Sequence, residues 1–293
     1  MKRSGQLFLA ALLCSCITAA ATAAVPRYNH VVVVIMENHS SADIYGSASA
    51  PYLNGTLIAQ GAKFTNSFAV THPSQPNYIA LFSGSTQGIV DDSCPHSFAT
   101  GNLAQQLIDA GLSFAQYSED LPSIGDTSCN VGLYARKHNP APDFPALPAT
   151  TNQPFSSFAG ALSAATLPTL SFVVPNLCND MHGAAPCTGV DLIALGDQWL
   201  QTNIPQFLNS RFAKNGLLIV TWDEDDSSGT NLIPTIFFGA HVRKNFVSST
   251  TITHFSVLRT LEDMYKLAPL GGAAAALPIS DVWDDVIFAD EFE

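Results

Sequence analysis

Acidic and amide side chains follow two apolar stretches of the sequence, and their types suit them to chemistry. Glu37 and Asn38 come directly after one such stretch, residues 31–36, and Asp223 and Glu224 come directly after another. Unbroken apolar stretches of this length predict strands that are buried on both faces of a parallel sheet. Because ligands bind beyond the carboxyl ends of such strands, we expect the two polar pairs to line a functional site.

The four side chains offer oxygen ligands. Carboxylate and amide oxygens suit Mg²⁺, Ca²⁺, Mn²⁺ or a harder form of iron, and they do not suggest a thiolate site. Burying several carboxylates at strand ends without a cation would be costly. Alternatively, residues 37–38 are a polar start to a loop and residues 223–226 are a solvated acidic turn. The occurrence of both pairs at equivalent strand ends favours one divalent metal ion.

Ser74 lies in a loop that leads into an apolar helical segment starting at Ile79. Serine is a preferred N-cap residue and proline is common in a first helical turn, so Ser74 could simply cap this helix. A hydroxyl that faces a cation could instead lose its proton and attack phosphorus, while free N–H groups of the helix bind the phosphoryl oxygens. The residue pattern leaves both interpretations open.

The remaining sequence predicts strands and helices in alternation, which is typical of one α/β domain. A long stretch rich in Pro, Asn and Ala, residues 121–154, is expected to be irregular, and loops of this length are usually functional. The hydrophobic periodicity and the helix stop signals predict the elements as follows. Strands are expected over 31–36, 63–70, 113–117, 169–174, 217–222 and 233–239, and helices over 51–60, 102–110, 155–165, 191–212 with an interruption near Pro205, and 254–266.

The N-terminal 24 residues have the pattern of a secretory signal peptide. A basic start at Lys2 and Arg3 precedes an apolar stretch, and small residues follow it up to Ala24. This pattern predicts an exported protein, secreted or periplasmic, with residues 25–293 as a single domain. No later apolar stretch approaches the roughly 20 residues of a membrane-spanning helix, so we expect no stable membrane anchor.

Cysteine usage and charge agree with export. Cys94, Cys129, Cys178 and Cys187 follow the predicted signal peptide. An even number of cysteines in an exported chain favours disulfides, with three possible pairings. Proximity in the sequence favours Cys94–Cys129 and Cys178–Cys187. The formal net charge of −12 argues against nucleic acid and anionic membrane surfaces as partners at neutral pH.

Six motifs occur in a specific order. They are VIMENHS (34–40), HPSQPNY (72–78), RKHNP (136–140), DMHG (180–183), TWDE (221–224) and HFSVLRT (254–260). Together they resemble the phosphoesterase family of secreted acid phosphatases and bacterial phospholipases C, within the alkaline-phosphatase-like superfamily. The resemblance spans residues 29 to about 267. It implies a three-layer α/β sandwich with a mainly parallel central sheet.

The resemblance also implies roles for the metal ligands and the nucleophile. Glu37, Asn38, Asp223 and Glu224 would bind one divalent metal ion of unknown identity. Ser74 would be both a ligand of that ion and the nucleophile that forms a phosphoserine intermediate. These are the residues that their types and positions already single out.

Basic residues are expected around the phosphoryl group. By similarity His138 and His182 are catalytic, with His182 as the acid that protonates the leaving alkoxide, and Lys137 binds the phosphate as an anion clamp. His72 and Asn77 flank the nucleophile and are predicted to contact substrate. Each histidine could instead be an ordinary hydrogen-bonding loop residue, and Asn77 could cap the same turn. We expect His254 to cap or pack the last helix, outside the site.

The resemblance leaves several functions to distinguish. Phospholipases C of the family are generally longer than this chain, which favours an acid phosphatase acting on phosphomonoesters, with lipid-linked phosphates such as phosphoinositides as a subset. A phospholipase C-type diesterase is the first alternative, and a noncatalytic secreted metal-binding or adhesive protein is the second. A sulfatase would require arginine at Asn77. A serine esterase would require a central serine in Gly84–Gly88, which the sequence lacks.

Overall fold

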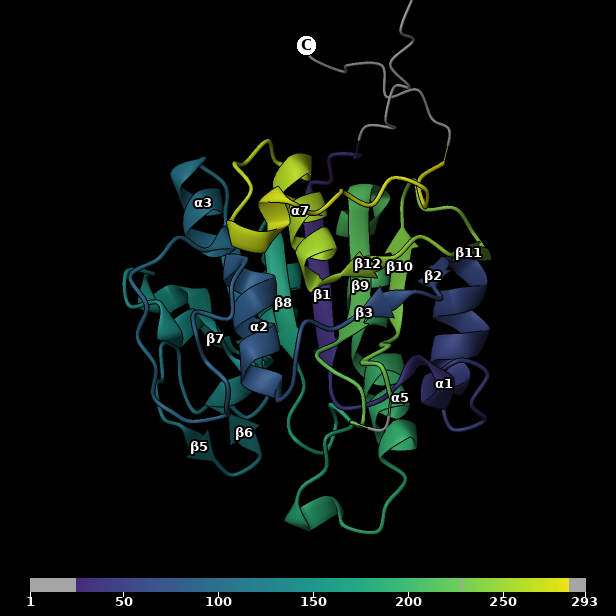
Figure 1. Ribbon diagram of the computed structural model, residues 1–293, viewed down its shortest axis with the longest axis horizontal. Helices are drawn as coiled ribbons and strands as arrows, with labels where there is room; N and C mark the ends of the chain where they lie inside the picture. Colours follow the sequence, from purple (N-terminus) through teal and green to yellow (C-terminus); the bar gives the residue numbers. More distant parts are fainter. Residues whose placement is uncertain (1–24, 228, 285–293) are drawn as a thin grey trace, which may run out of the picture.

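An eight-stranded sheet forms the centre of the molecule (Figure 1). The computed structural model describes residues 25–227 and 229–284, so the predicted signal peptide lies outside the described residues. The strand order is β11-β2-β10-β9-β1-β8-β4-β7. In chain order the strands are β1 (His30–Met36), β2 (Ala62–Phe64), β4 (Phe114–Ser118), β7 (Asn152–Pro154), β8 (Leu170–Val174), β9 (Gly216–Trp222), β10 (Thr235–Gly239) and β11 (Phe246–Ser248).

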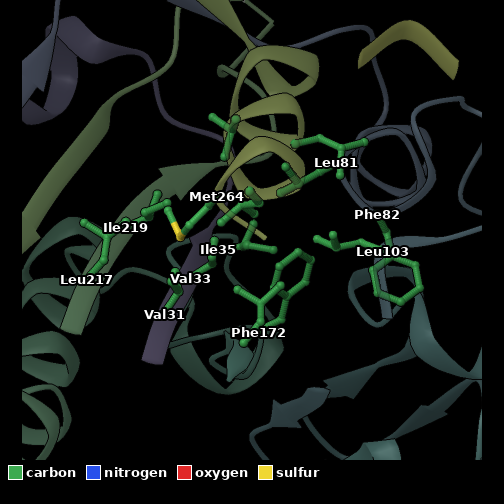
Figure 2. Close-up of a cluster of buried hydrophobic side chains, with 14 of the residues drawn as sticks. Val31, Val33, Ile35, Leu81, Phe82, Leu103, Phe172, Leu217, Ile219 and Met264 are labelled. Atoms are coloured by element: carbon green, nitrogen blue, oxygen red, sulfur yellow. The ribbon is translucent and has the colours of Figure 1, made fainter. Parts of the chain in front are cut away.

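Strand β1 is buried on both faces because its side chains alternate between two apolar clusters. Val31, Val33 and Ile35 belong to one cluster, and Val32 and Val34 belong to the other. Figure 2 shows the first cluster, in which Val31, Val33 and Ile35 lie among side chains of the neighbouring strands and helices. A continuous apolar strand is therefore required here, as the sequence predicts.

Helices cover both faces of the sheet and complete three layers. The cluster that contains Val31 includes side chains from α2 (Ser74–Ser83), α3 (Leu103–Asp109) and α7 (His254–Met264). The cluster that contains Val32 includes side chains from α1 (Ser41–Ile44), α4 (Ser156–Ser163), α5 (Leu192–Asn203) and α6 (Pro205–Leu208), together with a π-helical turn over Leu53–Ile58. The predicted three-layer α/β architecture is confirmed.

Two predicted elements differ from the structure, and strand β10 has a direction that the sequence did not predict. Strand β10 runs antiparallel to β9, since no crossover helix separates the two strands. The predicted strand 63–70 divides at Thr65, whose N–H bonds to Ser248, and continues as β3 (Ser67–Phe68) beside β12 (Ile252–Thr253) in a separate sheet. The predicted helix 191–212 ends as α6, and a 3₁₀ segment, Arg211–Asn215, follows it.

The long stretch 121–154 is irregular but ordered by short elements. It contains the pair β5 (Asn130–Val131) and β6 (Tyr134–Ala135), and 3₁₀ turns over Arg136–His138, Ala141–Asp143 and Ala149–Thr151. It ends in edge strand β7, which the sequence did not reveal because Asn152 and Pro154 have low strand propensity.

Both predicted disulfides are present. Cys94 is bonded to Cys129 and Cys178 to Cys187, with Cα–Cα distances of 5.8 Å and 5.9 Å. Among the described residues, none of the helices is both long enough and apolar enough to cross a membrane.

Candidate active site

Strands β1 and β9 are parallel neighbours, and their carboxyl ends coincide. Met36 pairs with Trp222 in the register, so Glu37 and Asp223 leave the sheet side by side. The N–H of Asp223 bonds to the carbonyl of Met36 at 3.0 Å, and the N–H of Asn38 bonds to Oδ1 of Asp223 at 3.2 Å. Asn38 turns the chain with a φ of 51°, a region that asparagine tolerates better than most residues. The two strand ends meet as the sequence predicts.

The first turn of α2 brings Ser74 to the same place. Ser74 is 1% exposed, and its Oγ lies 3.1 Å from Oε2 of Glu37 and 3.1 Å from Oε1 of Glu224. Pro73, and not Ser74, occupies the N-cap position of α2. The hydroxyl of Ser74 is therefore directed at carboxylates and does not cap the helix.

The oxygen atoms of this cluster face one another in a way that suits a cation. Oδ1 of Asn38 lies 3.2 Å from Oε2 of Glu37 and 3.3 Å from Oε1 of Glu224; all three atoms are acceptors, so these contacts need either a turned amide that donates to both carboxylates or a cation between the oxygens. Among the described residues, nothing hydrogen-bonds to the buried Oδ2 of Asp223. A cation would satisfy these oxygens, and the donor set of carboxylates, amide and hydroxyl fits a hard divalent ion.

The pKa values of the buried carboxyl groups also indicate a cation site. Burial, together with repulsion from Asp223 and Asp180, raises the pKa of Glu37 well above its ordinary value. Burial and the charge of Glu224 raise the pKa of Asp223 to about 7. Buried acids that repel one another in this way are costly unless protons or a cation neutralise them.

A second group of possible metal ligands shares Glu37. One ligand atom each from Glu37, His138 and His182 lie within 4.8 Å of one another. However, Nε2 of His182 lies 3.2 Å from the ammonium of Lys137, which competes with a cation for that nitrogen. The all-oxygen cluster around Ser74 is therefore the better fit for a metal ion.

His138 is enclosed between two carboxyl groups. Its Nε2 lies 3.2 Å from Oε1 of Glu37 and its Nδ1 lies 3.3 Å from Oδ2 of Asp180. The ring stacks on Tyr78, whose hydroxyl donates to Glu37. Burial, and then the charges of Lys137 and His182, lower the pKa of His138 well below its ordinary value. His138 and Tyr78 both contact Oε1 of Glu37, and these contacts hold the carboxyl group in place.

Lys137 and His182 lie beside this cluster and contact each other. The ammonium of Lys137 bonds to Oδ2 of Asp92 at 2.9 Å as well as to His182. Burial alone would lower the pKa of Lys137, but the charges of Glu37 and Asp92 prevail and raise it. Nδ1 of His182 bonds to the carbonyl of Gly183 at 2.8 Å, so Nδ1 carries the proton and Nε2 accepts from Lys137.

The other predicted substrate contacts have protein partners. Asn77 accepts from the N–H groups of Val70 and Thr71, both at 3.0 Å, and donates to two carbonyls of the same loop. These bonds favour its alternative role of bracing the turn before Ser74. His72 contacts the carboxylate of Glu224 through Nδ1.

His254 starts α7 and its Nε2 bonds to the carbonyl of Asp223 at 2.7 Å. Burial lowers the pKa of His254 to about 4, so the ring is neutral and Nε2 donates this bond. His254 thus packs at the start of the last helix, as expected, and in addition fixes the backbone that carries Asp223.

Comparison with known proteins identifies the family of the chain. The model of the phosphoesterase family matches residues 50–268. The chain belongs to the phosphoesterase family. It is 47% identical over 266 residues to a phosphatidylinositol-3-phosphatase of Mycobacterium tuberculosis, covering 90% of this chain and 86% of that protein. It is 30% identical over 262 residues to an acid phosphatase of Aspergillus fumigatus, covering 83% of this chain but 56% of the relative.

Structural similarity extends to the alkaline phosphatase superfamily. A member from Vibrio parahaemolyticus has a TM-score of 0.58 at 13% identity, with 85% of this chain and 69% of that chain covered. This likeness confirms the alkaline-phosphatase-like fold. The family and the relatives named as phosphatases identify this phosphoesterase as a phosphoric ester hydrolase.

Sequence reasoning missed three side chains of the phosphoesterase site. Asp180 follows β8, the other neighbour of β1, and stands in a recognised motif, so the strand-end argument could have found it. Tyr78 also stands in a motif, but no role was predicted for it. No motif or periodicity pointed to Asp92, because it lies in an irregular loop, residues 84–102, outside the motifs.

Proposed function

We propose that the protein is an exported, metal-dependent acid phosphatase that hydrolyses phosphomonoesters through a phosphoserine at Ser74. The observation that carries this proposal is the position of the Ser74 hydroxyl. It lies between the carboxylates of Glu37 and Glu224 at the first turn of α2. A serine so placed has both a proton acceptor and a helix N-terminus that favours anions.

Glu37, Asn38, Asp223 and Glu224, with Ser74, would hold one divalent cation. Such an ion supplies positive charge that favours the serine alkoxide and draws electron density from the phosphoryl oxygens. The acceptor-only contacts of Asn38 and the unpartnered oxygen of Asp223 support this set of ligands.

The protein's own groups would carry out the transfer in two steps. Oγ of Ser74 gives up its proton to a neighbouring carboxylate and forms a bond to phosphorus, while the bond from phosphorus to the alcohol oxygen breaks. Water then attacks phosphorus, the bond from phosphorus to Oγ breaks, and Oγ regains a proton. Lys137 and the N–H groups at the start of α2 would hold the phosphoryl oxygens.

His182 would give its proton to the leaving alcohol. Burial lowers the pKa of His182, opposed by its bond to Gly183, so the ring carries a second proton only in acidic solution. In neutral solution its Nε2 accepts from Lys137 and has no proton to give. An acidic pH optimum follows from this arrangement.

A lipid-linked phosphomonoester is the favoured substrate class. The relative from Mycobacterium tuberculosis is named as a phosphatidylinositol-3-phosphatase, and the match covers most of both chains. Export is supported by the N-terminal sequence pattern and by the two disulfides, which persist in oxidising compartments.

Substitution of Ser74 tests the proposal. We expect Ser74→Ala to lose phosphate release by about 10³-fold or more while its circular dichroism and thermal unfolding stay unchanged. Ser83→Ala is a matched control, since Ser83 is a buried serine at the other end of α2 whose Oγ bonds to Ile79. A noncatalytic metal-binding protein would lose nothing in either variant.

The substrate class is tested separately with the purified protein. Phosphoinositides, soluble phosphomonoesters and phosphatidylcholine are compared at acidic, neutral and alkaline pH. Release of inorganic phosphate from monoesters, strongest in acid, is expected. Cleavage of phosphatidylcholine with poor monoester turnover would instead show a phospholipase C-type diesterase.

A further inference from the structure

The carboxylate of Asp92 occupies the place beside Ser74 where an anion would be held. Its Oδ1 accepts from the N–H of Gln75 at 2.9 Å, and its Oδ2 accepts from the ammonium of Lys137 at 2.9 Å. Gln75 directly follows Ser74 at the start of α2, where backbone N–H groups have no partner within the helix. Two oxygens of one anion are therefore bound by a helix N-terminus and a lysine.

A phosphoryl group transferred to Ser74 needs the same two donors. Its oxygens must lie close to the Oγ of Ser74, and therefore close to the N–H of Gln75, and Lys137 is the ammonium that faces this position. A carboxylate and a phosphoryl group cannot both take these hydrogen bonds in full. Asp92 and the substrate thus compete for one pair of donors.

Asp92 is free to leave these donors. It stands in the irregular stretch 84–102, with the Cys94–Cys129 disulfide as the nearest covalent tether. Its side chain is 29% exposed, so the carboxylate has direct access to water. The two bonds named above hold it in place, and neither is to a residue of its own loop.

We propose that Asp92 is an internal competitor of the phosphate group, and that it sets how tightly the enzyme binds phosphomonoesters and releases inorganic phosphate. The proposal rests on the proposed function of Ser74 as the nucleophile. In the free enzyme Asp92 neutralises Lys137, and an entering phosphoryl group displaces it into solvent. After hydrolysis Asp92 returns and helps to expel the product.

The opposite role would be that Asp92 holds Lys137 in position for substrate. The two roles predict opposite signs for the same substitution. Asp92→Asn keeps an oxygen that can accept from Gln75 but removes the charge that competes with phosphate. If Asp92 competes, phosphate binding becomes tighter. If Asp92 only positions Lys137, phosphate binding becomes weaker.

Calorimetric titration of the metal-loaded protein with inorganic phosphate measures this sign without turnover. When Asp92 holds the donors in nine of ten molecules, the apparent affinity for phosphate is reduced about tenfold, so Asp92→Asn should bind about tenfold more tightly. Asp91→Asn is the matched control. It removes the same charge from the same loop, but Asp91 bonds only to Ser93 among the contacts described for it, so an unchanged phosphate affinity is expected.

A second measurement separates the competitor role from general effects of charge. In a Lys137→Met background the gain from Asp92→Asn should shrink, because the donor over which the two anions compete is gone. Phosphate binding by Asp92→Asn that is equal to or weaker than that of the unaltered protein, or no saturable phosphate binding by either protein, overturns the proposal. Absence of ester hydrolysis by the unaltered protein would instead refute the proposed function and leave this binding comparison intact.

Discussion

Glu37→Gln should stabilise the metal-free protein and remove most of the stabilisation that metal gives. Glu37 is fully buried and contacts Ser74, Tyr78 and His138. Glutamine has the shape of a protonated glutamic acid, so it preserves most of these contacts while removing the ionisable group. It also removes one carboxylate from the predicted cation site.

The magnitude in the absence of metal follows from the pKa of Glu37. The pKa of this carboxyl is raised well above its ordinary value of 4.5 by burial and by the charges of Asp223 and Asp180. Each pH unit between 4.5 and the raised pKa costs about 1.4 kcal/mol, so the cost at pH 7 is at most about 3 kcal/mol. The raised pKa means that stability is fully present below pH 4.5 and is lost as the pH rises. Glu37→Gln should therefore stabilise the metal-free protein by up to about 3 kcal/mol at pH 7 and by less than about 1 kcal/mol at pH 5.

The presence of metal should cancel the difference between the two proteins at pH 7 and reverse their order at pH 5. An ion at a hundred times its dissociation constant adds about 3 kcal/mol to a folded state that binds it. Glu37→Gln should lose most of this gain because a central ligand is missing. Urea unfolding in chelator and in Mg²⁺, Ca²⁺ or Mn²⁺, at pH 5 and pH 7, measures all of these differences.

Glu119→Gln is a suitable control for this measurement. Glu119 follows β4 at the same edge of the sheet, but its carboxylate bonds to the N–H of Asn176 and to the amide of Asn179, both at 2.9 Å. Its substitution should leave the metal response unchanged. A Glu37→Gln protein that is less stable than the unaltered protein in chelator at pH 7, or that keeps the full metal response, would refute the reasoning.

Three further predictions concern the surrounding residues. Lys137→Met should raise KM for a soluble phosphomonoester about tenfold or more, with a smaller change in kcat, as steady-state kinetics would show; an unchanged KM would contradict the anion-clamp role. Asp180→Asn should weaken the orientation of His138 and lower kcat/KM about tenfold, while a mutant with normal kinetics would limit Asp180 to a structural role. Glu262→Gln tests a buried acid far from the metal ligands. Burial raises the pKa of Glu262 to about 7, so its contribution to stability is present below pH 4.5 and is lost as the pH rises toward 7. Urea unfolding should show that the glutamine variant loses about 2 kcal/mol less between pH 5 and pH 7, and parallel pH profiles for the two proteins would contradict this.

The strand-end argument could be made from sequence because it depends on local patterns. Residues 31–36 and 217–222 are apolar on both faces, so their burial and parallel pairing follow from composition, and the polar residues after them must share one edge. Glu37 and Asp223 are adjacent in the structure for this reason. The start of α2 could also be predicted from a local pattern, because Pro76 and the apolar residues that follow it define a helix start.

The second half of the site could not be derived in this way. Lys137 and His138 belong to a 3₁₀ turn in an irregular stretch, where no periodicity fixes which way a side chain points. Family resemblance named both residues but gave no contacts. The antiparallel direction of β10 was also hidden, because a strand's apolar pattern does not record its direction.

The charge balance around Ser74 links the metal ion to Asp92. Glu37, Asp223 and Glu224 cluster at the hydroxyl, and Asp92 bonds to the N–H of the next residue, Gln75, and to the ammonium of Lys137. A phosphomonoester brings still more negative charge. Its entry is therefore favourable only if a cation offsets the charge of the three clustered carboxylates and if Asp92 moves away from Lys137. Metal removal should therefore weaken phosphate binding even in Asp92→Asn, because vacating the donors does not supply the missing positive charge. Tight phosphate binding by that variant in chelator would show that the oxygen cluster and the anion position are independent.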